Sequence, residues 1–319
     1  MRAANEAASR GFTVPRTLLG RVRRRLVPLT RGPQITARHP GSCDERYPTI
    51  ALDRLRTAPC VRDAIERTYS RQAPEVSFST GRLGVIIPVR DREHHLVELL
   101  ATLGPALATA GIEHRIYIVE QIAGLPFNKG QLFNAGARCA LECCDYLALH
   151  DVDFLPLKAS YAQPDRPLRP FAACFHGEGR RPLPEPFFGG VVLLPAADLA
   201  RANGFSNQYW HWGKEDDDFL LRVVLAGRVP CFDRAGSFRE IEHPASRDHH
   251  PDGSPPRSGS ERRALRRLYL RNRARFRDMA RGLQDPAEDG LSTLPGRIIA
   301  RREEATMLRL LVEPRGMPE

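Results

Sequence analysis

The 319-residue sequence has no apolar run near the length of about 20 residues that a membrane-spanning helix needs. It also shows no secretory signal peptide, because the apolar N-terminal stretch Leu18–Leu29 is interrupted by four arginines. These absences speak against an integral membrane protein. They predict a cytoplasmic protein, or one whose membrane anchor lies outside this sequence.

Cysteine pairs spaced C-x-x-C, which would indicate zinc or redox chemistry, are also missing. The seven cysteines are odd in number, so we expect free buried thiols in a reducing compartment rather than a disulfide framework. No internal repeat with a period of about 20 to 50 residues is visible, which speaks against a solenoid or a propeller.

Positive charge, in contrast, is in excess: 48 Lys and Arg face 38 Asp and Glu, giving a net charge of +10, and most of the basic residues are arginines. Such a surface attracts nucleotide phosphates, acidic glycans, anionic lipid headgroups or nucleic acid. A GC-rich coding sequence would produce the same arginine excess, and composition does not choose between the two explanations.

The chain divides into a leader and an organised domain. Residues 1–80 are rich in Arg and Pro and predict a partly ordered leader with one short helix near Thr49–Ser70. Residues 81–315 predict one organised domain. There, strands and helices alternate in the order Leu83–Val89, His95–Ala110, Arg115–Glu120, Asn128–Glu142 and Tyr146–His150.

This alternation predicts an α/β fold with an open sheet and right-handed crossovers. Ligands in such sheets lie at the carboxyl ends of the strands. Further along, Phe188–Leu194 predicts another strand, Asp217–Ala226 a helix that begins among acidic residues, and Glu261–Arg281 a strongly basic helix.

The first candidate site is the pair Asp151 and Asp153, directly after the predicted strand Tyr146–His150. Two carboxylates flanking one residue offer the hard oxygen ligands that suit Mn²⁺ or Mg²⁺. A cation held there could bridge the phosphates of a nucleotide sugar. Two solvated loop aspartates are the simpler alternative.

The second candidate is the run from Tyr209 to Asp218, which joins Trp210 and Trp212 to four consecutive acids. Crowded carboxylates repel one another, so one with a raised pKa could act as a general base. The tryptophans offer flat faces of the kind that stack on sugar rings. Acids at a helix N-terminus also complement the helix dipole, but that alone leaves the tryptophans unexplained.

Two weaker candidates complete the set. Glu240-Ile241-Glu242-His243 offers an imidazole, a common metal ligand, although a single histidine is more often structural. Arg90 and Arg92 follow the first strand, where they could grip a diphosphate or belong to a solvated loop.

Together these motifs resemble the beta-1,4-galactosyltransferase family over roughly Leu83 to Val312, in the family's chain order. The branch that galactosylates xylose and the bacterial relatives are closest in motif. The resemblance is carried by Ile87-Pro88-Val89-Arg90-Asp91-Arg92-Glu93, Phe127-Asn128-Lys129-Gly130-Gln131-Leu132-Phe133-Asn134, Asp151-Val152-Asp153, Phe188-Gly189-Gly190, Asn203-Gly204-Phe205-Ser206-Asn207, Trp210-His211-Trp212-Gly213-Lys214-Glu215-Asp216-Asp217-Asp218, His243 and Asp289-Gly290-Leu291-Ser292-Thr293-Leu294.

The resemblance implies an inverting, metal-dependent glycosyltransferase with a nucleotide-sugar-binding, Rossmann-like α/β fold. Its donor would be a UDP-sugar and its acceptor a glycan, glycoside or glycoprotein, joined in a beta-1,4 linkage. Localisation in the Golgi lumen would follow if an anchor lies outside this sequence.

The implied roles are these. Asp216 would be the base, with Glu215 beside it at the sugars. Mn²⁺, or Mg²⁺, would be held by Asp153, His243 and Glu240. Acceptor binding would fall to Phe187, Asp217 and Trp210. Donor binding would fall to Pro88, Arg90, Arg92, Phe127, Lys129, Asp151, Gly190, Trp212 and Gly213, with Trp212 in a mobile loop that closes over the donor.

Four departures from the family pattern stand out. Glu240 lies near the place of a family Met or His ligand, and an oxygen ligand would broaden tolerance toward Mg²⁺. Phe187 replaces a Tyr that helps to select galactose, so the donor stays open between UDP-galactose and UDP-N-acetylgalactosamine. Lys129 replaces an Arg and loses its bidentate fork. His211 and Lys214 replace glycines, which would stiffen the loop.

Two other function classes remain to be weighed. A catalytically silent module that binds a UDP-sugar or glycan would keep the fold, but the intact acidic cluster argues against it. A nucleic-acid binder would use the basic helix, yet no stacking platform accompanies its arginines, so no nucleic-acid partner is expected. Two simpler interpretations of that helix are peripheral contact with an anionic membrane and a solvated helix face. The oligomeric state is not predicted.

Overall fold

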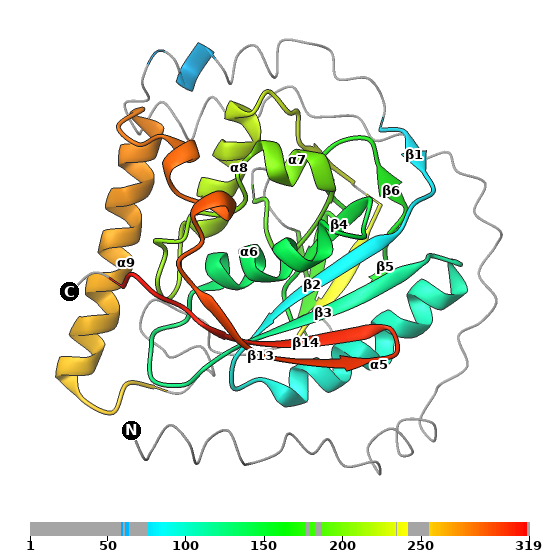
Figure 1. Ribbon diagram of the computed structural model, residues 1–319, viewed down its shortest axis with the longest axis horizontal. Helices are drawn as coiled ribbons and strands as arrows, with labels where there is room; N and C mark the ends of the chain where they lie inside the picture. The colour runs from blue at the N-terminus through cyan, green and yellow to red at the C-terminus, as the bar shows by residue number, and fades with distance from the viewer. Residues whose placement is uncertain are drawn as a thin grey trace. The chain divides into compact units, whose positions relative to one another are not determined.

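The computed structural model describes residues 59, 61–63, 76–176, 179–182, 187–233, 235–241 and 255–317 (Figure 1). All of these residues belong to one compact unit, His39–Glu319. Of the predicted leader helix near Thr49–Ser70, residues 59 and 61–63 are described and are helical.

An eight-stranded mixed sheet forms the centre of this unit, in the order β11-β7-β10-β4-β2-β3-β14-β13. Its middle strands β4, β2 and β3 run parallel, as the sequence predicts, whereas β10 pairs antiparallel with β4. The bounds are β2 Leu83–Val89, β3 His114–Gln121, β4 Tyr146–His150, β7 Leu168–Arg169, β10 Val191–Pro195, β11 Cys231–Phe232, β13 Arg297–Glu304 and β14 Met307–Glu313.

Strand β2 shows why the sheet is buried on both faces. All seven of its residues are buried, and successive side chains point to opposite sides. Val85 and Ile87 pack in a core with Leu96 and Leu99 of α5 (Glu93–Thr109). Ile86 packs in the other core, with Leu132, Phe133 and Ala135 of α6 (Lys129–Ala140).

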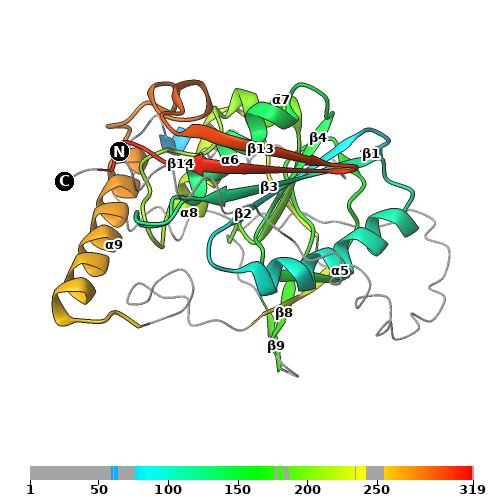
Figure 2. The same cartoon turned by 60° about the horizontal axis from the view of Figure 1, so that its bottom comes forward.

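The helices lie close to their predicted ranges. Helix α8 (Glu215–Leu225) begins two residues earlier than expected, and α9 (Gly259–Ala280) is the predicted basic helix. The shorter helical elements are α7 (Ala196–Arg201), η1 (Pro286–Glu288) and η2 (Leu291–Thr293). Figures 1 and 2 show α5 and α6 on opposite sides of the sheet, with α8 and α9 beyond α6.

Two smaller sheets complete the fold. One has the order β5-β12-β8-β9, and the other pairs β1 with β6. Their bounds are β1 Phe78–Ser79, β5 Phe154–Lys158, β6 Gln163–Pro164, β8 Ala173–His176, β9 Gly179–Pro182 and β12 Ser237–Glu240. The four-stranded sheet positions the site, because β5 directly follows Asp153 and pairs with β12.

Several features bear on the other predictions. Cys139 and Cys144 are free and buried, as expected, whereas Cys143 is free and exposed; Cys174 and Cys231 are also buried. Cys43 and Cys60 lie outside the described residues. Within the described ranges, no helix has both the length and the apolar character that would let it cross a bilayer.

Candidate active site

Three elements bring their ends together at one place. Asp151 follows β4, and its backbone N–H donates to the Gly190 carbonyl over 2.7 Å. Lys129 is the first residue of α6, and Glu215 and Asp216 are the first two residues of α8. The segments come from three separate stretches of the chain, so only the fold makes them neighbours.

Lys129 is the centre of this cluster. Its ammonium lies 3.0 Å from Oδ2 of Asp151 and 2.9 Å from Oδ1 of Asp216. Glu215 is more distant, with 3.9 Å between Lys129 Nζ and Glu215 Oε1. The Lys129 side chain is only 12% exposed, so one cation and three carboxylates share a poorly solvated space. We call these four residues the Lys129 cluster.

Burial and charge together set the pKa values of the Lys129 cluster. Burial raises the pKa of Asp216 well above its usual range; Lys129 opposes this shift, while Glu215 and Asp151 add to it. Burial likewise raises the pKa of Asp151 and of Glu215. Burial would lower the pKa of Lys129, but the neighbouring carboxylates outweigh it and leave that pKa raised. The lysine is therefore charged, and Asp216 takes up a proton more readily than an ordinary aspartate.

The turn before α6 fixes where Lys129 points. Asn128 caps the helix by accepting the Gln131 N–H over 2.9 Å. The Asn128 N–H donates to Gln121 Oε1 over 2.8 Å, and the Gln121 amide donates to the Pro126 carbonyl. Gln121 closes this turn from the end of β3, a role that no motif in the sequence indicates.

His150, at the end of β4, supports the turn into Asp151. It is fully buried, and burial lowers its pKa to about 4, so the imidazole is neutral at neutral pH. Its Nδ1 lies 2.9 Å from the Asp151 carbonyl and its Nε2 lies 2.9 Å from the Tyr161 hydroxyl. A neutral ring satisfies both contacts when Nδ1–H donates and Nε2 accepts from the hydroxyl.

Asp153 lies next to the Lys129 cluster and is almost completely buried. Its Oδ2 accepts a hydrogen bond of 3.0 Å from Arg92 Nη1, which brings two predicted site residues together. Its backbone carbonyl accepts the Ile241 N–H over 2.8 Å, and Glu240 pairs with Phe154 across β12 and β5. His243 lies outside the described residues. No group of three or more His, Cys, Asp or Glu suited to a metal occurs within the described part.

The first loop after β2 contains the other predicted arginine. Pro88 lies within buried β2, and the Arg90 guanidinium stands 5.7 Å from the centroid of the Phe127 ring. Arg90 also donates to the Leu125 carbonyl and pairs with Asp91 over 3.5 Å. Arg90 and Phe127 thus form one wall, a flat ring beside a cation, of the sort that a base and a phosphate could contact.

The Gly189-Gly190 turn leaves room for the Asp216 carboxylate. A Cβ added at Gly189 would lie 2.4 Å from Asp216 Oδ2, so no larger residue fits without moving that carboxylate. Gly190 has a φ of 74° and packs against the Phe154 ring. The adjacent Phe187 is held by buried Arg169, which donates to the Phe187 carbonyl. Arg169 was not foreseen from the sequence, since it belongs to no motif.

The two tryptophans lie in different environments. Trp212 is 45% exposed and stacks on Tyr269 of α9, with 5.7 Å between ring centroids. Trp210 is only 1% exposed, and its carbonyl accepts from Asn272 of α9 over 3.0 Å. Direct contact of the Trp210 ring with a ligand would require it to move, whereas Trp212 is accessible as it stands.

The loop between the tryptophans and α8 has unusual backbone angles. His211, Gly213 and Lys214 all have positive φ, of 66°, 107° and 76°. Gly213 donates its N–H to Glu215 Oε2 over 3.0 Å, and Lys214 pairs with Asp217 over 2.7 Å. His211 and Lys214 therefore adopt the left-handed conformation that glycine favours.

A buried polar network lies behind the acids. Asp218 accepts from the Tyr209 hydroxyl and from Arg222, and Arg222 also donates to the Asp289 carbonyl. Asp289 accepts from Ser206, Asn207 and Arg275. This network connects α8 and α9 with the loop after α7 and with the late Asp289-Gly290 motif. No pattern in the sequence indicates these contacts.

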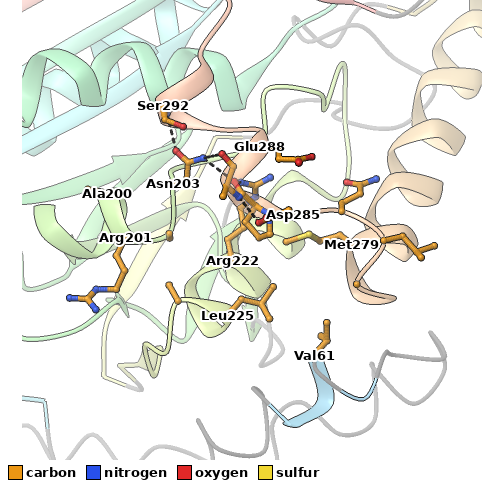
Figure 3. A pocket seen from close by; sticks show the side chains of 17 residues that line it. Val61, Ala200, Arg201, Asn203, Arg222, Leu225, Met279, Asp285, Glu288 and Ser292 are labelled. Atoms are coloured by element: carbon orange, nitrogen blue, oxygen red, sulfur yellow. Dashed lines mark hydrogen bonds between the residues drawn. The ribbon is translucent and has the colours of Figure 1, made fainter.

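A separate hollow of about 790 Å³ lies near the other end of α8 (Figure 3). Asn203, Arg222, Leu225, Met279 and Asp285 are among the residues that line it, and none belongs to the Lys129 cluster. The Arg222 guanidinium in its wall is engaged by Asp218 and by the Pro286 and Asp289 carbonyls. This guanidinium thus serves the fold.

Comparison with known proteins places this geometry in a family. The model described as the N-terminal region of glycosyl transferase group 7 matches residues 54–162, and that described as the N-terminal domain of galactosyltransferase matches residues 175–244. Beta-1,4-galactosyltransferase 3 of Rattus norvegicus is 33% identical over 81% of this chain and 64% of its own length, and that of Homo sapiens is 32% identical over the same shares. The chain thus spans less than two thirds of these relatives.

A solved structure agrees. The catalytic domain of Drosophila beta1,4galactosyltransferase 7, in complex with xylobiose, matches 74% of this chain and 94% of its own, with a TM-score of 0.56 and 25% identity. The two family models, in chain order, span both sides of the Lys129 cluster, and the predicted α/β fold of nucleotide-sugar transferases is confirmed. The chain therefore belongs to the beta-1,4-galactosyltransferase family.

Proposed function

We propose that this protein transfers a galactose-type sugar from a UDP-sugar to a sugar hydroxyl, with inversion at the anomeric carbon and formation of a beta-1,4 linkage. The observation that carries the proposal is the convergence of Asp151, Glu215 and Asp216 around Lys129 at the carboxyl end of the sheet. The family's relatives are named as beta-1,4-galactosyltransferases, and one related structure is described as a complex with manganese, UDP-Gal and xylobiose.

Asp216 is the proposed general base. Its carboxylate is held by Lys129 on one side and bordered by Gly189 on the other, which leaves it at a fixed place at the N-terminus of α8. Its raised pKa makes it a stronger proton acceptor than an exposed aspartate, once ionised. In the proposed reaction it takes the acceptor hydroxyl proton, while that oxygen bonds to the anomeric carbon and the UDP oxygen departs from the opposite face. Glu215 would contact the sugars beside it.

Two carboxylates at the end of β4 support a site for a divalent cation. Asp153 provides a buried carboxylate, Asp151 a second one, and the Ile241 N–H bond to Asp153 brings the chain within two residues of His243. We propose Asp153, His243 and Glu240 as ligands of Mn²⁺, with Mg²⁺ tolerated because oxygen ligands are hard. The cation would supply positive charge for the departing diphosphate.

The donor and acceptor would lie on opposite sides of the Lys129 cluster. Arg90 and Phe127, with Pro88 behind them, would hold uridine, and Arg92 and Lys129 would face the diphosphate. Trp212 and Gly213 would cover the donor next to Gly190. On the acceptor side we place Phe187 and Asp217, with buried Trp210 as support rather than as a contact surface. The acceptor would be a glycan, a glycoside or a glycoprotein.

The test is a panel of UDP-sugars with xylosides, glucosides and N-acetylglucosaminides in the presence of Mn²⁺, with products identified by mass. We expect UDP release that requires both Mn²⁺ and an acceptor, with UDP-galactose or UDP-N-acetylgalactosamine as donor. The variant Asp216→Asn should abolish transfer and leave UDP binding nearly intact. UDP binding without transfer by the wild type on the whole panel would instead identify a catalytically silent binding module.

A further inference from the structure

The outer face of α9 is a strongly charged surface that the proposed reaction does not use. Within this helix, which is described in full, seven arginines are exposed: Arg262, Arg263, Arg266, Arg267, Arg271, Arg273 and Arg277. Its two acidic residues, Glu261 and Asp278, are half-buried. We call the exposed side of α9 the arginine face.

An exposed leucine lies in the middle of the arginine face. Leu270 is 51% exposed, and on a helix its neighbours at i−4, i−3 and i+3 are Arg266, Arg267 and Arg273. At the edge of the face, Trp212 is 45% exposed and stacks on Tyr269. The inner side holds Leu265, Asn272, Phe276 and Met279, all buried, so the two sides of the helix are sharply different.

The helix has the length and position for contact with a flat surface. Its 22 residues extend about 33 Å. In both Figure 1 and Figure 2 it stands at one edge of the described part, with the sheet on its inner side only. A row of cations around a central leucine matches a bilayer, where arginines reach headgroup phosphates and the leucine enters the acyl boundary.

We propose that the arginine face docks this protein on an anionic lipid surface. Soluble nucleic acid or acidic glycan would use the arginines but would leave Leu270 in water. Docking would also place the loop that contains Trp210 and Trp212 close to the lipid, because Asn272 and Tyr269 of α9 contact these two tryptophans. The proposal goes beyond the proposed function and does not depend on it.

The experiment is sedimentation of the full chain with phosphatidylcholine vesicles and with vesicles that also contain phosphatidylserine. We expect binding only to the anionic vesicles, and weaker binding at high salt. The triple variant Arg263→Gln, Arg266→Gln and Arg267→Gln should weaken it about 100-fold, at roughly fivefold for each charge removed. Leu270→Ser should weaken it about fivefold, yet leave binding to soluble heparin unchanged.

A matched control removes the same charge elsewhere. Arg297, Arg301 and Arg302 are exposed on β13, and changing all three to Gln gives the same net charge as the α9 triple. We expect this control to retain most of the vesicle affinity. If both triple variants lose the same vesicle affinity, net charge alone explains the binding and the proposal is overturned. So would binding that is indifferent to phosphatidylserine, or a Leu270→Ser variant that binds vesicles as the wild type does. Unchanged thermal unfolding shows that the variants are folded, and vesicle binding needs no donor sugar.

Discussion

At the scale of single residues, the Lys129 cluster is defined by an imbalance of charge. One ammonium faces the carboxylates of Asp151, Asp216 and Glu215, so at least two negative charges stay uncompensated if all three are ionised. Desolvation makes that costly, which is why the pKa of each carboxylate is raised. In the proposed mechanism, a lysine at this place would therefore do more than face the diphosphate: it would keep Asp216 available as a base.

Replacing Lys129 with Met should shift the pH dependence of transfer. Lys129 lowers the pKa of Asp216 against the effect of burial, so its removal lets that pKa rise. Because the base acts when ionised, the acid limb of the kcat/KM profile should move to higher pH, by about one to two units. Transfer would be lost near the acid limb and recovered at higher pH.

The matched variant is Lys129→Arg, which keeps the charge. Its acid limb should stay close to that of the wild type. Both profiles are measured at saturating Mn²⁺, so that changes in metal affinity do not enter. An acid limb that stays in place in Lys129→Met would show that Asp216 is not the titrating base.

At the scale of elements, the loop 211–214 sets how α8 begins. Three of its four residues have positive φ, and Gly213 lies against the Tyr269 ring. An ordinary residue at such angles costs about 1 to 3 kcal/mol. The sequence of the loop does not favour this conformation. Contacts with α9 hold the loop in it.

Gly213→Ala should impair both folding and transfer. The new Cβ would sit at a φ of 107° and 3.1 Å from the Tyr269 ring, so it disturbs the stack that supports Trp212. We expect a loss of about 2 kcal/mol in the free energy of unfolding and at least a tenfold lower kcat. Gly227→Ala is the control: its φ is 76°, but nothing lies within 4 Å of the added Cβ. It should lose stability and keep kcat, and a kcat loss in both variants would refute a specific role for the loop.

An element can be predicted from the sequence when the pattern that indicates it lies within the element itself. Strands β2, β3 and β4 were predicted because runs such as Leu83–Val89 are apolar throughout and end in polar turns. The hairpin β13–β14 was not predicted, because Arg297–Glu304 is mostly charged and exposed and resembles a helix face. It forms strands only because β14 finds the edge of β3, a pairing across nearly 200 residues.

The site shows the same division. Asp151, Asp153, Glu215 and Asp216 were recognised because their motifs are compact in sequence. Gln121 and Arg169 position the site from outside any motif, and only the fold shows their contacts. The burial of Trp210 was also not evident, since a tryptophan beside acids suggests a sugar platform until packing places it against α9.

At the scale of the whole molecule, Asp289 joins segments that are distant in the chain. Its carboxylate accepts from Ser206 and Asn207 on the loop after α7, and from Arg275 on α9. The backbone carbonyl of Asn207 in turn accepts from Asn128, which caps α6, and from Gln131 within α6. This hydrogen-bond network thus holds together the helices that present Lys129 and Asp216. Its last residue, Asp289, lies about 70 positions beyond Asp216 in the chain.

Asp289→Asn should therefore destabilise the fold as a whole. The substitution changes none of the residues that we propose bind a ligand. The amide keeps one acceptor but loses the charge that Arg275 and Arg222 face, at 2.9 Å and 3.7 Å from Asp289 Oδ2. We expect a loss of about 2 kcal/mol in the free energy of urea unfolding, the range found for hydrogen bonds to charged groups. The control is Glu303→Gln, which breaks an ion pair with Arg115 whose glutamate is 75% exposed and should change stability by less than about 0.5 kcal/mol. If both variants unfold at the same urea concentration as the wild type, Asp289 is not a joint between α6, α8 and α9, and the alignment of Lys129 with Asp216 must come from the apolar core alone.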